Sequence, residues 1–234
     1  MRLSDREVQK YLDNVVRDRN IVFVIGSGRS GTSLLQRCMA TAREPVYYWS
    51  ENSLTEVFKQ RRIIGKNLVL KRTYACHRLF SQIPSGIKVL NIVRNPSAVF
   101  TSRVRQQSGY YIKSDWWIAK YLAFKDLIRS HPAENLMTVR FEDLISNPNS
   151  LQSDIGKKLQ IEFDLPFTRY TERNYLDHKI DEFTGEQRVW EAIDPTRANK
   201  SRTPQEQRQR MVELAEDLKP HLSNFCSEYG YEAY

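Results

Sequence analysis

The chain has 234 residues, of which 40% are hydrophobic and 27% are charged, a composition too apolar for a disordered chain. Its size suits one α/β domain with a sizeable core. The net charge of +8 favours anionic ligands, with nucleic acid, a multiply phosphorylated nucleotide and an anionic glycan as candidates. Because the basic residues are spread along the chain rather than gathered in one run, we expect no nucleic-acid partner.

Simple features argue against a secreted, membrane or zinc protein. The first 20 residues are polar and lack the apolar stretch of a signal peptide, and no apolar run could span a bilayer. We therefore expect a soluble, cytoplasmic protein with no membrane partner. The three cysteines, Cys38, Cys76 and Cys226, are widely spaced, and no histidine lies in an H-E-x-x-H arrangement. Neither a disulfide framework nor a bound metal is expected.

Hydrophobic patterning predicts strands that alternate with helices. After a short lead-in helix over 1–20, the expected strands span 21–25, 46–49, 67–70, 87–93 and 136–141. The expected helices span 32–42, 54–64, 76–82, 95–107 and 114–130, the fourth with Asn95 as its cap and Pro96 in its first turn. This alternation is typical of a parallel, doubly wound sheet. We therefore predict an α/β, P-loop-like fold with about five strands, in a single domain over 1–234.

The pattern weakens after residue 165. Residues 171–203 are polar and irregular, and a segment of this length is typical of a lid or an acceptor-binding loop. A final helix is expected over 204–230, because Thr203 and Glu206 form a capping box. Three residues mark where this helix could begin, bend and end: Pro204, Pro220 and Gly230.

A glycine-rich turn follows the first expected strand and opens the next helix. Its sequence is Gly26-Ser27-Gly28-Arg29-Ser30-Gly31-Thr32-Ser33. In this setting successive backbone N–H groups can surround an anion, and the helix dipole adds partial positive charge. The glycines permit the close backbone approach that this requires. The alternative is a tight turn that binds nothing.

The turn departs from the nucleotide-triphosphate P-loop, G-x-x-x-x-G-K-[ST]. Gly26 and Gly31 fit its spacing, but Thr32 occupies the position of the required lysine. The cation is instead Arg29, inside the turn. The fourth strand is followed by Arg94, where an acidic metal ligand could be expected. The sequence therefore predicts that fixed cations rather than Mg²⁺ neutralise the phosphates.

Residues 25–33 resemble the 5′-phosphosulfate loop of sulfotransferases that use 3′-phosphoadenosine-5′-phosphosulfate (PAPS), a loop with a pattern close to P-[RK]-[ST]-G-[ST]-[ST]. The resemblance implies that Arg29 holds the 5′-phosphosulfate, helped by loop amides and by the hydroxyls of Thr32 and Ser33. The whole segment Gly28-Arg29-Ser30-Gly31-Thr32-Ser33 is therefore expected to contact the donor. Gly28 stands where many members have proline, which costs rigidity but removes no ligand.

Residues 92–102 resemble the 3′-phosphate segment of the same family. That segment is a strand ending in arginine, then Asp-Pro, then a helix with a serine eight residues after the arginine. Here the arginine is Arg94 and the serine is Ser102, with Asn95 in place of aspartate. A guanidinium can hold a phosphate through two parallel hydrogen bonds, at a strand end where such sheets bind ligands. The alternative is a surface arginine and an ordinary helical serine.

The resemblance implies transfer of a sulfuryl group to a hydroxyl or amine acceptor, with a base and a cation as helpers. Glu51 is the favoured base, because residues 48–52 are similar to a G-E-[NT] segment that carries the catalytic glutamate in several branches. Its alternative role is a favourable charge at a helix N-terminus. His77 is the second candidate. For the cation we favour Arg29 and then Lys71, which could equally be a solvated strand-end lysine.

The tail supplies further candidates. Three basic residues could close over the 3′-phosphate, although solvated charges are slightly favoured: Arg197, Lys200 and Arg202. Three aromatic residues could line an acceptor pocket, although a core role is favoured: Trp116, Trp117 and Tyr121. Residues 139–144 resemble the family's Y-E-D-L turn, and 194–234 resemble its D-P-x-R stretch and final helix.

The acceptor is not specified by these motifs. A carbohydrate or a small metabolite is expected, and a peptide tyrosine is an alternative. The donor is expected to be PAPS, with 3′,5′-adenosine bisphosphate (PAP) as product and no metal. Two other functions are weighed against this one: a magnesium-dependent P-loop nucleotide kinase, and a non-catalytic module that binds nucleic acid or an anionic glycan. The motifs leave the oligomeric state open.

Overall fold

The structure of the chain is a computed structural model. The structure describes residues 20–44, 46–50, 67–73, 76–103, 109–173, 192–195 and 204–232, and for 46–50 it describes the backbone only. The helices expected over 1–20 and 54–64, the capping box at Thr203 and most of the segment 171–203 lie outside these residues. Every helix in the described part is too short or too polar to cross a lipid bilayer.

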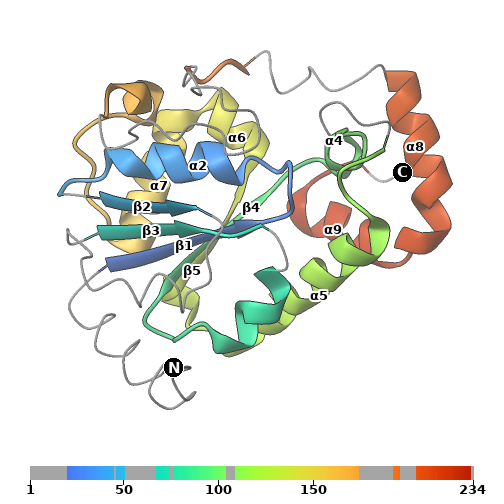
Figure 1. Cartoon of the computed structure of the whole chain (residues 1–234), viewed down its shortest axis with the longest axis horizontal. Helices are drawn as coiled ribbons and strands as arrows, with labels where there is room; N and C mark the ends of the chain where they lie inside the picture. Colours follow the sequence, from blue (N-terminus) through green and yellow to red (C-terminus); the bar gives the residue numbers. More distant parts are fainter. Residues whose placement is uncertain are drawn as a thin grey trace.

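A five-stranded parallel sheet forms the centre of the molecule (Figure 1). Its strands are β1 (Asn20–Gly26), β2 (Val46–Ser50), β3 (Asn67–Lys71), β4 (Lys88–Val93) and β5 (Leu136–Arg140), in the order β2-β3-β1-β4-β5. The predicted α/β fold with a doubly wound parallel sheet is confirmed. Since all neighbouring strands are parallel, the segments that follow β1, β3 and β4 emerge at one edge of the sheet.

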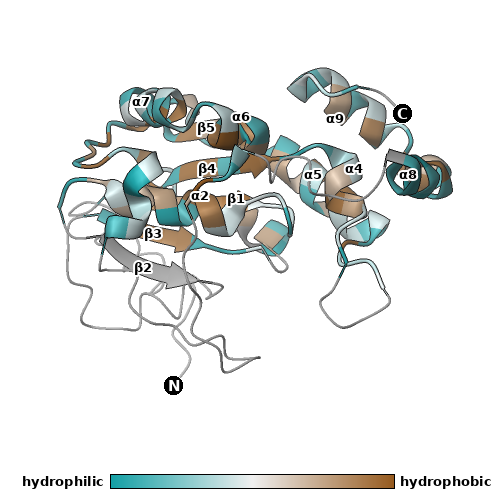
Figure 2. Cartoon of the chain, turned by 90° about the horizontal axis from the view of Figure 1, so that it is seen from above, coloured by the Kyte–Doolittle hydropathy of each residue, from teal (hydrophilic) through white to brown (hydrophobic). Residues whose placement is uncertain are grey.

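Both faces of the sheet are buried, which explains the continuous apolar runs of its strands. In β1, Val22 and Val24 belong to one core cluster, whereas Ile21, Phe23 and Ile25 belong to the other. The strands β1, β3 and β4 are buried along most of their length and lie between the helices that cover the two faces (Figure 1), and Figure 2 colours the chain by hydropathy. Burial on both faces therefore holds the strand ends that carry the candidate site.

Helices cover the two faces (Figure 1). One face carries α2 (Thr32–Cys38), α6 (Phe141–Ser146) and α7 (Pro148–Leu159). The other carries the 3₁₀ helix η2 (Cys76–Gln82) and part of α5 (Ser114–Ser130). Three further 3₁₀ helices are η1 (Met39–Thr41), η3 (Ala133–Asn135) and η4 (Phe167–Glu172). The α6 and α7 helices were not predicted.

A third core lies beyond the carboxyl edge of the sheet. It joins α5 to α4 (Pro96–Phe100), α8 (Pro204–Leu218) and α9 (His221–Tyr229). Trp117 and Tyr121 stack here with ring centroids 5.7 Å apart, and both are buried. The favoured core role is thus confirmed for these two residues. It is wrong for Trp116, whose side chain is 41% exposed, because it points away from this core.

Two expected helices differ from the structure. The helix expected over 204–230 is divided into α8 and α9, because Pro220 has no N–H to continue the α8 ladder. Gly230, with φ of +68°, ends α9 as expected. The helix expected over 95–107 ends at Phe100, so Ser102 lies outside it. The Ser102 carbonyl oxygen accepts a hydrogen bond from the Tyr111 N–H (2.8 Å).

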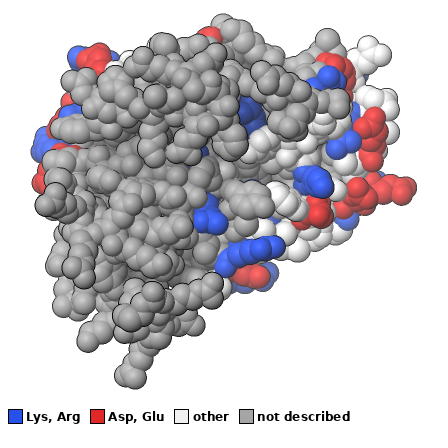
Figure 3. Space-filling view, viewed as in Figure 1, with Lys and Arg blue, Asp and Glu red and all other residues white. Residues whose placement is uncertain are grey.

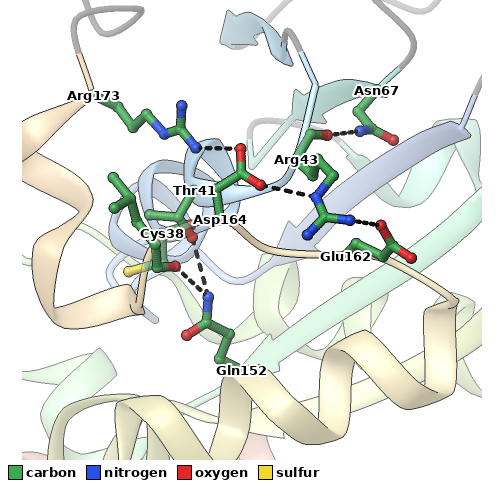
Figure 4. Close-up of polar contacts among 9 residues, drawn as sticks. Cys38, Thr41, Arg43, Asn67, Gln152, Glu162, Asp164 and Arg173 are labelled. Carbon is green, nitrogen blue, oxygen red and sulfur yellow. Dashed lines mark hydrogen bonds and ion pairs between the residues drawn. The ribbon is translucent and has the colours of Figure 1, made fainter.

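A polar cluster fixes the chain just before β2 (Figure 4). Arg43 forms ion pairs with Glu162 (2.6 Å) and Asp164 (3.0 Å), and Asp164 also pairs with Arg173 (2.9 Å). The Arg43 carbonyl accepts a hydrogen bond from the Asn67 side chain at 2.6 Å. These bonds tie the segment that follows α7 to the starts of β2 and β3.

Candidate active site

The glycine-rich turn joins β1 to α2 at the carboxyl edge of the sheet. Arg29 and Gly31 have positive φ, +68° and +99°, and such alternation turns backbone N–H groups toward one side. Gly31 is required here, because a Cβ at this position would clash with the Phe141 ring. The Ser30 hydroxyl donates to the Ser27 carbonyl (2.7 Å), so this side chain shapes the turn rather than pointing to solvent.

The structure brings together the two arginines and the serine that the sequence singled out. Arg29 Nε donates to Ser102 Oγ at 2.7 Å, and Arg94 Nη1 donates to the Arg29 carbonyl at 3.1 Å. The Arg94 guanidinium also lies 4.2 Å from the centre of the Phe141 ring. The alternative of an ordinary helical serine does not fit Ser102, which lies outside α4, whereas phosphate binding by Arg94 and Ser102 stays a prediction.

The electrostatics of this group favour an anion. Burial lowers the pKa of Arg94, Glu142 raises it, and the nearby positive charge of Arg29 lowers it further. A guanidinium stays protonated despite such effects, so two positive charges remain close together in a partly buried site. A bound phosphate would offset both the burial and the repulsion.

Lys71 reaches the other side of the turn. Its ammonium donates to Ser33 Oγ at 3.0 Å, and the residue is only 7% exposed. The alternative of a solvated strand-end lysine is therefore wrong, because Lys71 is held at the first turn of α2. Thr32, the first residue of α2, is buried, and Ser33 is half-buried.

His77, the second candidate for the base, lies on η2. Burial lowers its pKa, and the positive charges of Lys120 and Arg78 lower it further. Its Nδ1 is buried and has no hydrogen-bond partner within the described part of the chain. These effects favour the neutral form of the imidazole.

A small cavity lies behind the turn, between β4, α5 and α9. Its volume is about 40 Å³, and its polar lining comes from Ser27, Ser30, Asn91, Arg94 and Lys120. This volume suits ordered water rather than an acceptor molecule. The buried Lys120 was not predicted, because it lies within the apolar stripe of α5.

No family model and no curated protein sequence matches the chain. Among solved structures, the sulfotransferase domain from the curacin biosynthetic pathway is 14% identical with a TM-score of 0.57, over 84% of this chain and 98% of that one. The chain has the fold of the sulfotransferases.

Two further structures support the sulfotransferase fold. The sulfotransferase domain of the Synechococcus PCC 7002 olefin synthase is 20% identical with a TM-score of 0.52, over 84% of this chain and 96% of that one. Mouse sulfotransferase SULT7A1, complexed with PAP, is 12% identical with a TM-score of 0.51, over 94% of both chains. At these identities the likeness establishes the fold, and the activity must be argued from the site.

Four of the predicted site residues lie outside the described part of the chain. They are the favoured base and the three basic residues of the tail: Glu51, Arg197, Lys200 and Arg202. Their roles remain predictions. Within the described residues, no group of three or more histidine, cysteine or acidic side chains could hold a metal ion.

The structure adds three residues that the sequence did not assign to the site. Tyr111 packs on Gly28, where a Cβ would come within 2.7 Å of its ring, and Arg29 lies 5.9 Å from the centre of that ring. Glu142 and Tyr231 are hydrogen bonded to each other at 2.8 Å. Resemblance to the Y-E-D-L turn and to the final helix had pointed to the segments of Glu142 and Tyr231, but to no role for either.

Proposed function

We propose that this protein transfers a sulfuryl group from PAPS to a hydroxyl or amine acceptor. The observation that carries the proposal is the group formed by Arg29, Ser102 and Arg94 beside a glycine-rich turn. Two arginines linked in this way, one through its backbone carbonyl, suit a ligand with several phosphate or sulfate groups. The sulfotransferase fold and the PAP complex of SULT7A1 support the same donor.

In this proposal the donor lies across the carboxyl edge of the sheet. Arg94 and Ser102 hold the 3′-phosphate, whereas Arg29, Ser33 and the backbone of the turn hold the 5′-phosphosulfate. Arg29 lies between the two phosphate positions, because its Nε is bonded to Ser102 while its backbone belongs to the turn. Arg197, Lys200 or Arg202 would add a contact to the 3′-phosphate.

The chemistry is an in-line displacement at sulfur. The acceptor oxygen or nitrogen forms a bond to sulfur as the bond from sulfur to the bridging phosphate oxygen breaks. Negative charge builds on that leaving oxygen, and Arg29 and Lys71 are the cations placed to stabilise it. The acceptor proton goes to Glu51, with the neutral imidazole of His77 as the second candidate. No metal is required by these steps.

The acceptor is proposed to be a carbohydrate or a small metabolite. A peptide tyrosine is the alternative, and transfer of label from PAPS across a panel of such acceptors distinguishes them. Nucleic acid is a weaker candidate, because acidic side chains are interspersed with the basic ones on the described part of the face in Figure 3.

A thermal-shift measurement tests the donor. A ligand that binds only the native state stabilises it and so raises the melting temperature. When the ligand concentration is 100 times the dissociation constant, the added stability is about 2.7 kcal/mol. We expect PAP to raise the melting temperature and ATP–Mg²⁺ to have little effect. Stabilisation by ATP–Mg²⁺ alone would indicate a kinase, and no response to either nucleotide would favour a non-catalytic binding module.

A further inference from the structure

Glu142 joins two parts of the molecule that are far apart in the sequence. It is the second residue of α6, directly after β5, and β5 pairs with β4 through Val93 and Arg140. One carboxylate oxygen accepts a hydrogen bond from the backbone N–H of Asn95 at 3.0 Å. The other accepts one from the Tyr231 hydroxyl at 2.8 Å. The end of β4 is thereby connected to the segment that follows α9.

Tyr231 is held firmly at its end of this connection. Gly230 takes a left-handed conformation, and the Tyr231 N–H then donates to the Cys226 carbonyl at 2.9 Å. The Tyr231 ring is stacked on Phe225, with an interplanar angle of 6°, and the Arg140 guanidinium lies 4.7 Å from its centre. The hydroxyl is therefore presented to Glu142 by a ring with a fixed position.

At the other end, the bond to Asn95 controls the peptide that follows Arg94. The Asn95 N–H belongs to the peptide unit between Arg94 and Asn95, so Glu142 fixes the plane of that unit. The Asn95 side chain caps α4 by accepting from the Ser97 N–H at 2.9 Å. Phe141, the neighbour of Glu142, meanwhile packs on the Arg94 guanidinium. Two neighbouring residues at the start of α6 thus contact Arg94 or the peptide that follows it: Glu142 bonds the peptide, and Phe141 packs on the side chain.

We propose that Glu142 and Tyr231 are positioning residues, which orient Arg94 toward the 3′-phosphate of a nucleotide. This inference rests on the proposed function, since it takes the ligand of Arg94 to be a 3′-phosphate. The pair has a second effect: hydrogen bonds from Tyr231 and Asn95 occupy both oxygens of the Glu142 carboxylate, whose negative charge acts on Arg94. The acid then supports the phosphate site instead of competing with the phosphate for Arg94.

The test measures the dissociation constant of PAP by calorimetry. Tyr231→Phe keeps the stacked ring and removes the hydroxyl, so we expect binding to weaken about five- to tenfold. Glu142→Ala should weaken it similarly, whereas Glu142→Gln should stay within about twofold of the wild type. The amide oxygen can still accept from the Asn95 N–H, and the amide N–H can donate to Tyr231. Tyr229→Phe, which removes a hydroxyl from α9 but leaves the bridge intact, is the matched control.

Measurements in an Arg94→Lys variant distinguish positioning of Arg94 from a general structural effect. Arg94→Lys keeps the charge but cannot form two parallel hydrogen bonds. If Tyr231 acts through Arg94, adding Tyr231→Phe to this variant should change PAP affinity less than about twofold. A full loss in that background, or wild-type affinity in Tyr231→Phe, would overturn the inference. A wild-type protein that does not bind PAP would instead overturn the proposed function, and this inference with it.

Discussion

At the scale of single residues, the candidate site depends on cations that are already held in place. Arg29 is bonded to Ser102 and Lys71 to Ser33, so each side chain has a defined direction before a ligand arrives. Preorganised side chains lose less conformational entropy on binding, and this strengthens their contribution to affinity. The individual contacts can therefore be tested by substitution.

Replacement of Arg29 by alanine should weaken PAP binding about 10- to 100-fold, because a hydrogen bond to a charged group contributes about 1.5–3 kcal/mol. Calorimetry measures the change. Arg129→Ala is the control: it removes the same charge from an exposed ion pair with Asp126 on α5. Equal losses in the two variants would mean that net charge, rather than the geometry of the turn, drives binding.

Glu51→Gln should leave PAP affinity unchanged and lower turnover at least about 100-fold, as expected for loss of a general base. Turnover is followed by transfer of label from PAPS to an acceptor found in the panel. His77→Asn should lower turnover only a few-fold. The reverse pattern would assign the base to His77.

At the scale of elements, two short connections depend on contacts with distant parts of the chain. The turn after β1 needs residues with left-handed backbone conformations. The segment before β2 needs the ion pairs of Arg43. Both connections are irregular. The turn after β1 packs on Phe141 of α6, and the segment before β2 is bonded to Glu162 and Asp164, which follow α7.

Gly31→Ala should destabilise the fold by about 1–3 kcal/mol, because a side chain is strained at φ of +99° and would also clash with Phe141. Urea denaturation gives the free energy of unfolding. Gly109→Ala is a suitable control, since a Cβ at Gly109 meets no atom within 4 Å. Similar stabilities for the two variants would contradict this account of the turn.

The ion pairs around Asp164 predict a pH dependence of stability. Hydrogen bonds from Arg173 and Arg43 lower the pKa of Asp164 in the folded state. The stabilisation is therefore present above the unfolded pKa of about 3.9 and is lost as the pH falls through the folded value.

Asp164→Asn should accordingly lower the melting temperature at pH 7, and its difference from the wild type should shrink as the pH falls below about 4. Asp126→Asn, which breaks an ion pair whose acid is 75% exposed, should have little effect at any pH. A difference for Asp164→Asn that does not depend on pH would show that lost packing, not charge, is responsible.

At the scale of the whole molecule, the third core connects the end of the chain to the site. Phe225 of α9 lies at its centre, with ring centroids 5.0 Å from Trp117 and 5.9 Å from Tyr231. Since Tyr231 bonds to Glu142, the packing of the last helices extends to the end of β4. The C-terminal helices therefore serve the site although they lie outside the sheet.

Phe225→Ala should lower the free energy of unfolding by about 3–5 kcal/mol, because it removes a ring that is only 6% exposed and leaves a cavity. Urea denaturation measures this cost. Val212→Ala, on the face of α8 where the side chain is 72% exposed, should change stability by less than about 0.5 kcal/mol. We also expect Phe225→Ala to weaken PAP binding, and unchanged affinity would argue against the link through Tyr231.

The sequence by itself was sufficient to predict the sheet, the glycine-rich turn and the cap of α4. These are local features: a buried parallel strand needs a continuous apolar run, and Asn95 caps its own helix. The α7 helix was missed although a signal existed. Pro148 occupies its first turn, and Leu151, Ile155 and Leu159 recur at helical spacing.

Only the tertiary structure decided the remaining features, because they depend on contacts between residues far apart in the chain. The Ser102 carbonyl accepts a hydrogen bond from the Tyr111 N–H, and the buried Lys71 donates one to Ser33. Glu142 and Tyr231 are hydrogen bonded although they lie 89 positions apart in the sequence. Sequence periodicity reports on a single element, whereas a hydrogen bond between elements is settled by how they pack. The motifs could therefore name the arginines of the site, but not the residues that orient them.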